Sequence, residues 1–419
     1  MELTLVAALL GSALLGAPGP IPLEKITDST ILPPGVTGTI LLGSSPDSCL
    51  GNVFFAVLDE AGRLGLYAAT PQGLTVIANH TTPVPGSMST FQRVTRLTCA
   101  GDKLFFLGKD DLGPMSGGSS IYSYAQGSIS LVFEVGTPIG STFFEGFNSL
   151  DVADSDILVD AILSPASTNE AIVVIPFGES PMIVADITTV LPGQTDPATI
   201  YSRPVFVGAD VFFHARTATE VAIYRWREGE GITVIADTTT PVSVSGQGTF
   251  VAFGIFADLG GRFVFGATFL GGLGIFAFED GQFEPVVLPG DMTADGATFF
   301  SVSDPRGAGN LLTFAGRTQE DGLLEAVFVK EGDGLPRRLL GVGDTFEGRE
   351  VHRIASNADH RDVLVWAENL EPPGFQAIYR ARFGAAATDI PVLSWWGVLV
   401  LGAGLAVAGW WTLGRLLTQ

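Results

Sequence analysis

The chain has 419 residues, of which 46% are apolar and 16% are charged, and its formal net charge is −22. A nucleic-acid phosphate backbone requires a basic protein face, so this acidic chain is not expected to bind nucleic acid or to adhere to an anionic membrane surface. The 53 glycines, 25 prolines and 29 phenylalanines favour many short strands joined by turns.

Residues 1–17 are expected to form an export signal. The apolar run from Leu3 to Leu15 has the length of a signal-peptide core, it is too short to span a bilayer comfortably, and the small residue Ala17 lies shortly after it. The alternative interpretation is an ordinary buried helix.

A repeat with a period of about fifty residues runs through the middle of the chain. Each unit contains a short apolar or aromatic run opened by a turn, followed by a second apolar run, which is typical of a β-hairpin. A third run and a fourth, which begins near Thr-Phe, complete the unit. The first runs begin at Gly51, Asp102, Ser155, Ala209, Gly261, Asn310 and Arg361.

Four strands in a unit of this length are typical of a β-propeller blade. We therefore predict an all-β, seven-bladed propeller over residues 23–383. The strand at Leu23 to Thr30 resembles the third strand at Leu74 to Thr81, and it is expected to complete the last blade, because an open ring would leave unpaired strand edges. With the Thr-Phe strand innermost, the blades are expected at 38–79, 90–134, 142–186, 199–237, 249–288, 298–342 and 350–383.

The repeats resemble the bacterial choice-of-anchor family of NxxGxxAF tandem repeats, which occur on exported proteins with varied C-terminal sorting tails. Gly51 to Phe55 and Gly261 to Phe265 carry the Gly-x-x-apolar-Phe part of the motif, and Asn357 is the nearest match to its asparagine. The resemblance covers residues 23–383, and it implies a fold without implying a reaction.

The C-terminal region is predicted to be a linker and sorting motif at 384–391, a transmembrane helix at 392–413 and a short cytoplasmic tail at 414–419. An uncharged run of this length crosses the hydrocarbon layer as a helix, and Trp395, Trp396, Trp410 and Trp411 stand where aromatic belts lie. Arg415 beyond the run weakly indicates a cytoplasmic C-terminus. The membrane is therefore an expected partner.

The same tail resembles an IPTL-type C-terminal sorting signal, which implies processing by an exosortase-like membrane protease. The alternative interpretation is a plain single-pass anchor. The matching residues are Ile390, Pro391, Leu393, Ser394, Trp396 and Gly397.

Cys49 and Cys99 occupy equivalent places in successive repeats. An oxidising compartment permits a disulfide, but equivalent points on neighbouring blades can lie beyond the reach of one. Two interpretations stay open, a disulfide and two semi-buried thiols.

The histidines lack the spacing of a metal site. His214 is interpreted as a structural residue of a strand, whereas His352 and His360 are expected in the last blade's inner strand and turn, where they would face a central channel. No catalytic residue, cofactor-binding residue or metal ligand is therefore predicted.

Two sets of aspartates are also interpreted from their positions. Asp186, Asp237, Asp291 and Asp344 recur after a third strand, which indicates capping of turns. The acidic string Asp151, Asp154, Asp156 and Asp160 admits Ca²⁺, but it is favoured as a set of solvated turn carboxylates, because the EF-hand spacing is missing.

These features together predict an exported, non-catalytic module of the cell surface or extracellular matrix, held at least transiently by the cytoplasmic membrane. Its ligand is expected to be a polysaccharide or a surface protein. The alternative is an extracellular polysaccharide lyase or hydrolase with its site at the propeller channel. The irregular loops at Lys109 to Ser119, Leu163 to Glu170 and Thr188 to Thr199 unite no base with a nucleophile, which favours the binding role.

Overall fold

The computed structural model describes residues 21–383, apart from 44, 50, 112–117, 154–155, 165–168, 219, 245, 323, 360–361 and 371–373. The predicted export signal, linker, transmembrane helix and sorting motif lie outside the described residues. Every helix or strand assigned within them is a β-strand, so the all-β prediction is confirmed. The search for a helix able to cross a membrane found none in this part of the chain.

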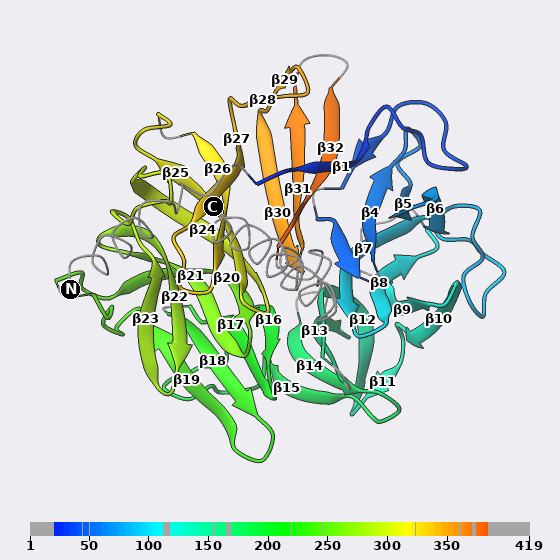
Figure 1. Ribbon diagram of the computed structural model, residues 1–419. Coiled ribbons are helices and arrows are strands. Elements are labelled where there is room, and N and C mark those ends of the chain that lie inside the picture. The colour runs from blue at the N-terminus through cyan, green and yellow to red at the C-terminus, as the bar shows by residue number, and fades with distance from the viewer. Residues whose placement is uncertain are drawn as a thin grey trace, which may run out of the picture. The chain divides into compact units, whose positions relative to one another are not determined.

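The strands form antiparallel groups in chain order (Figure 1). A single parallel pair, Leu64 with Arg93, joins the first two groups into one nine-stranded sheet. The first group is β2 (Leu41–Leu42), β3 (Asp47–Cys49), β4 (Asn52–Leu58), β5 (Leu64–Thr70) and β6 (Gly73–Ala78), and the second is β7 (Arg93–Ala100), β8 (Lys103–Lys109), β9 (Ser120–Ala125) and β10 (Ser128–Phe133).

Four further sheets follow with the same antiparallel order. The third group is β11 (Pro138–Ile139), β12 (Thr142–Val152), β13 (Asp156–Leu163), β14 (Glu170–Pro176) and β15 (Met182–Asp186). The fourth is β16 (Ile200–Val207), β17 (Asp210–Arg216), β18 (Val221–Arg227) and β19 (Gly231–Asp237). The fifth is β20 (Phe250–Leu259), β21 (Arg262–Phe269), β22 (Gly272–Glu279) and β23 (Gln282–Val287), and the sixth is β24 (Phe299–Ala308), β25 (Leu311–Thr318), β26 (Glu325–Glu331) and β27 (Arg337–Gly341).

The last sheet combines strands from the two ends of the described chain. Its order is β1 (Glu24–Asp28), β32 (Phe375–Arg382), β31 (Asp362–Asn369) and β30 (Arg353–Asp359), and the small hairpin of β28 (Thr345–Phe346) and β29 (Arg349–Glu350) precedes it. β1 runs antiparallel to β32, and Arg380 forms an ion pair of 2.9 Å with Glu24 across the two strands. The predicted pairing of the N-terminal strand with the last repeat is therefore present.

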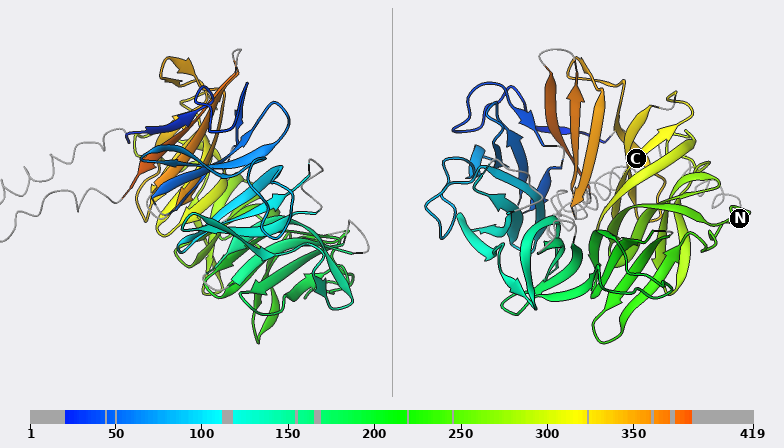
Figure 2. Two further views of the ribbon diagram at one scale, coloured as in Figure 1. Left: turned by 90° about the vertical axis from the view of Figure 1, so that its right-hand side faces the viewer. Right: turned by 180° about the vertical axis from the view of Figure 1, so that it is seen from behind.

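One strand of each group contacts its counterpart in the next group, and these contacts form a closed cycle. β3, β7, β12, β16, β20, β24 and β30, called the inner strands below, each touch the next, and β30 touches β3. Figures 1 and 2 show the groups following one another around a common centre, with the colour running from blue to orange. The ring brings residues from distant parts of the sequence to one interior wall.

Aromatic residues on the second and third strands fill the space between neighbouring groups. Phe106 on β8 stacks on Tyr122 on β9 with ring centroids 5.6 Å apart, and Phe314 on β25 stacks on Phe328 on β26 at 5.8 Å. A phenylalanine of a Thr-Phe pair packs edge-on against this pair of rings, as Phe91, just before β7, does on Tyr122 at 4.9 Å. Aromatic pairs of this geometry stabilise beyond their buried area, so the recurring phenylalanines are core residues.

Candidate functional site

One position of the inner strands joins neighbouring groups by a hydrogen bond. Asp47 Oδ2 accepts the Cys99 backbone N–H at 3.1 Å, and Asp151 Oδ2 accepts the Phe206 N–H at 2.8 Å. In both residues Oδ1 accepts the N–H of the following residue. Asn357 makes the corresponding contact by donating its Nδ2–H to the Pro46 carbonyl at 3.1 Å. These three side chains are called the Asx clamps.

The Asx clamps occupy one place in the repeat. Asp47 pairs with Phe54, Asp151 with Leu158 and Asn357 with Leu364, and each partner directly precedes a buried core residue of the second strand. Asp47 and Asp151 therefore stand where the structure has Asn357, the residue that the sequence matched to the motif asparagine. In the sixth group this place belongs to Arg306, which pairs with Thr313.

A two-residue β-bulge interrupts β7, β16, β20 and β24, and in three of these strands it begins with a residue of positive φ other than glycine. The pairing skips Arg96 and Leu97 in β7, Arg203 and Pro204 in β16, and Asp304 and Pro305 in β24. The first residue of each of these three bulges has a positive φ, of 54° for Arg96, 57° for Arg203 and 55° for Asp304, and all three side chains are exposed. Bulges of this kind redirect a side chain away from the ladder.

The arginines of these strands lie close enough to influence one another. Burial lowers the pKa of Arg306, the positive charges of Arg96 and Arg203 lower it further, and the negative charge of Asp304 opposes them. These residues come from β7, β16 and β24, which are all inner strands, so they lie on the wall of the ring.

Asp160 on β13 lies beside this group of charges. Its side chain is 5% exposed, and burial together with the charge of Glu170 raises its pKa to about 8, against a smaller opposing effect of Arg96. Asn148 Nδ2 donates to its carboxyl at 3.4 Å. Asp160 is therefore largely protonated at pH 7 and does not neutralise Arg96.

The acidic string is thus not a set of solvated turn carboxylates, which corrects the interpretation from sequence. Asp151 is a clamp between β12 and β16, Asp160 is buried, and Asp156 begins β13; Asp154 lies outside the described residues. Burial and the charge of Asp258 raise the pKa of Asp151 despite its two backbone hydrogen bonds. In the described part of the chain no group of three acidic, histidine or cysteine residues is arranged to hold a metal ion.

The recurrent aspartates after the third strands cap turns, as predicted. Asp186 Oδ1 accepts the Thr188 N–H at 2.9 Å, and Asp237 Oδ1 accepts the Thr239 N–H at 2.8 Å. Burial alone would raise the pKa of Asp186, but the hydrogen bonds from the threonines lower it. Asp291 and Asp344 accept backbone N–H groups in the same region of their groups.

Two histidines fall into different surroundings. His214 on β17 is half-buried with its Nδ1 3.2 Å from Ser202 Oγ, and burial, with Arg203 and Arg216, lowers its pKa to about 4. His352 lines an open groove of about 700 Å³ between β25–β26 and β30–β31, together with Arg317, Glu325 and Trp366. It therefore faces the neighbouring group rather than the centre of the ring; His360 lies outside the described residues.

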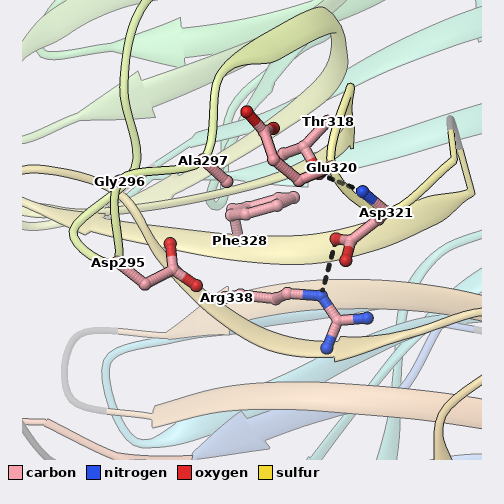
Figure 3. A pocket seen from close by; sticks show the side chains of 8 residues that line it. All are labelled: Asp295, Gly296, Ala297, Thr318, Glu320, Asp321, Phe328 and Arg338. Carbon is pink, nitrogen blue, oxygen red and sulfur yellow. Dashed lines mark hydrogen bonds and ion pairs between the residues drawn. The ribbon is translucent and has the colours of Figure 1, made fainter.

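A smaller cavity of about 270 Å³ lies on the sixth group (Figure 3). Its carboxylates already have partners within the fold: Glu320 accepts the Thr298 N–H at 2.9 Å, and Asp321 pairs with Arg338 at 3.2 Å. Both ends of the Arg338 guanidinium also bond to Asp344. These groups hold loops together, so the cavity presents little free polar chemistry.

Cys49 and Cys99 form a disulfide, with Cα atoms 5.9 Å apart. Of the two interpretations left open by the sequence, the structure has the bridge, because β3 and β7 are adjacent inner strands. The sorting-motif residues Ile390, Pro391, Leu393, Ser394, Trp396 and Gly397 lie outside the described residues.

No family model and no curated protein sequence matches the chain. Among solved structures, the β-propeller domain of the trilobed protease from Pyrococcus furiosus, whose topology is described as open velcro, matches with a TM-score of 0.51 and 10% identity. The match covers 82% of this chain and 95% of that domain. The acylaminoacyl peptidase of Pyrococcus horikoshii matches with a TM-score of 0.48 and 12% identity, over 78% of this chain and 49% of the peptidase.

The polysaccharide lyase Uly1 matches with a TM-score of 0.46 and 12% identity, over 82% of this chain and 90% of the lyase. The chain spans about half the length of the acylaminoacyl peptidase that it matches. At these identities the likeness concerns the fold alone. The match to the P. furiosus domain confirms that the fold of this chain is a β-propeller.

Proposed function

We propose that the chain is a seven-bladed propeller, closed by β1, that serves as a binding module. The cycle of inner strands and the pairing of β1 with β32 support this architecture. One observation carries the binding role: Arg96, Arg203 and Arg306 lie on three separate inner strands with exposed side chains, and the charges of Arg96 and Arg203 act on Arg306. Convergent polar groups on a rigid scaffold are typical of a ligand site.

The same proposal places the module outside the cytoplasm. The Cys49–Cys99 disulfide supports export, because such bonds persist in oxidising compartments. The repeat's resemblance to the choice-of-anchor family supports the same location. In this account residues 1–17 direct export, the helix at 392–413 tethers the chain, and the motif at Ile390 to Gly397 is read by an exosortase-like protease.

The ligand in this proposal is a polysaccharide or a surface protein. The second candidate function is cleavage of an extracellular polysaccharide. The raised pKa of Asp160 favours it, because a carboxyl group protonated at neutral pH can act as a general acid. The burial of the same side chain favours the binding role, since a substrate cannot reach it without opening of the strands.

Two assays on the full chain, exported from a bacterial host and purified in detergent, separate these functions. The first is retention on an array of bacterial glycans and surface proteins, and the second is release of reducing or unsaturated ends from exopolysaccharides. The proposal predicts retention on the array with no release of products. Catalytic turnover would overturn the binding role, and it should then fall when Asp160→Asn is introduced.

A further inference from the structure

The bulges hold arginines where glycine would be the least strained residue. A positive φ is uncommon outside glycine, and it strains a residue with a bulky side chain. Arg96 and Arg203 both adopt it, at 54° and 57°. Strained backbone of this kind, when it persists, is concentrated at ligand sites.

The arginines of this group lack the internal partners that other arginines of the protein have. Within the described residues, the side chains of Arg96 and Arg306 have no hydrogen bond or ion pair, and the Arg203 side chain makes one long bond, from Nη1 to the Phe253 carbonyl at 3.5 Å. Arg227, by contrast, binds Asp210 through two nitrogens, and Arg338 binds Asp344 in the same way.

The other titratable groups facing these arginines leave them positively charged. His214 beside Arg203 has a pKa near 4 and is neutral at pH 7, and Asp160 beside Arg96 is largely protonated. Among the charges that act on Arg306, Asp304 opposes Arg96 and Arg203. Positive charge is thus concentrated here in a chain whose net charge is −22.

We propose that Arg96, Arg203 and Arg306 form a binding site for a multiply charged oxyanion, a sulfate or the carboxylates of an acidic sugar. This inference rests on the proposed binding function and names its ligand class. Guanidinium groups suit such a ligand, because each donates in a planar fork that matches two oxygens of a carboxylate or sulfate. The oxyanion has two sources, a free inorganic ion and an acidic glycan.

Titration calorimetry on the full chain at pH 7 and low ionic strength tests the site with three probes: inorganic sulfate, trigalacturonate and neutral maltotriose. We expect sulfate or trigalacturonate to bind, and maltotriose to give no heat. Arg96→Gln, Arg203→Gln and Arg306→Gln should each weaken binding at least tenfold, because a charge-assisted pair is lost. Lys103→Gln is the matched control, since it removes one exposed positive charge at the start of β8 and should change affinity less than twofold.

Binding of sulfate alone supports a site for the free ion, and tighter binding of trigalacturonate supports a site for an acidic glycan. The proposed site is wrong if all three arginine variants bind the anions as tightly as the wild type does. It is also wrong if neither anion gives heat with the wild type. If calorimetry rules out the oxyanion site but the array still retains neutral glycans, the chain is a binding module whose ligand is not an oxyanion. If a glutamine variant misfolds, Arg96→Gly and Arg203→Gly replace it in the test, because glycine adopts the positive φ of the bulge without strain. The unfolding temperatures of these glycine variants should not fall.

Discussion

Asp47 and Arg306 hold the same place in the repeat but use it in opposite ways. The carboxylate of Asp47 accepts hydrogen bonds from Ser48 and Cys99, and the Cys49–Cys99 disulfide ties the same two inner strands. The Arg306 side chain on β24 has no hydrogen-bond or ion-pair partner among the described residues, and the charges of Arg96 and Arg203 act on it. A charge used inside the fold is unavailable to a ligand, whereas one left unpaired is available.

This difference teaches how a repeat acquires a site. The repeated geometry supplies equivalent positions around one axis, and most of them join neighbouring groups. Where the joining side chain is replaced, other contacts must hold the two groups. Between β25 and β30 the hydroxyls of Thr313 and Ser356 lie 2.9 Å apart. Four predictions test the two halves of this comparison.

The largest effect is expected at Asp160, whose protonation keeps Arg96 free. Its folded pKa of about 8 lies above the unfolded value of 3.8, so the folded state binds the proton more tightly and stability falls as the pH rises from about 4 to 8. Asp160→Asn should remove a pH-dependent loss on the order of several kcal/mol. Urea unfolding between pH 7 and 8.5 measures the last part of this loss, about 1 kcal/mol, since His214 is neutral in the folded state and largely neutral in the unfolded state there.

Below pH 6.5 His214 provides an internal control, because its titration changes the free energy of unfolding with pH in the direction opposite to that of Asp160. The folded pKa of His214, about 4, lies below the ordinary value, so stability is lost as the pH falls from about 6.5 to 4. The Asp160→Asn variant should still lose stability as the pH falls from about 6.5 to 4, because it keeps His214. If the Asp160→Asn variant loses as much stability as the wild type between pH 7 and 8.5, the decline does not come from Asp160.

The disulfide is expected to be the next largest contribution, on the clamped side of the comparison. The double variant Cys49→Ser, Cys99→Ser opens a loop with a sequence separation of 50 residues, and it should lower the free energy of unfolding by about 2–4 kcal/mol. Denaturant titration of the double variant against the wild type measures the loss. An unchanged midpoint would mean that the Asp47 contact alone fixes β3 on β7.

Asp151→Asn tests an Asx clamp by replacing one carboxylate oxygen with an NH₂ group. Asp151 accepts two N–H groups through its two oxygens, and an asparagine would set an NH₂ group against one of these donors. We expect a loss of about 1–3 kcal/mol, as for an unsatisfied buried group. The control is Asn357→Ser, which removes a donated bond without opposing two donors, and it should cost less. Equal losses would contradict the assigned donor directions.

The smallest effect is expected at the bulges. Arg96→Gly should raise the free energy of unfolding by about 1 kcal/mol, because glycine relieves the positive φ. Thermal unfolding of this variant beside Arg93→Gly, which lies on the same strand outside the bulge, measures the gain. A marked loss at Arg96 would show that its side chain is a structural contact of the fold.

The sequence carried the features that repeat. The hairpins, the aromatic core and the capping aspartates are local or periodic, so Asp186 and Asp237 could be interpreted from their recurrence after a third strand. The pairing of β1 with β32 was also predictable, because the first strand resembles the third strand of a repeat.

The Asx clamps and the arginine group could not be read in the same way. Asp151 contacts Phe206, which is 55 residues away, and only the ring makes them neighbours. A two-residue bulge shifts the alternation of a strand without an evident signal, so Arg96 and Arg203 resembled ordinary polar strand residues. A signal was present in retrospect: Arg203-Pro204 and Asp304-Pro305 place proline in an inner strand, where bulges accommodate it.

The most direct test of the free arginines is diffraction from crystals of the full chain soaked in selenate, with its anomalous signal located. The account predicts a peak within hydrogen-bond distance of the guanidinium groups of Arg96, Arg203 and Arg306. Arginines paired with carboxylates of the chain, and no peak between them, would contradict it.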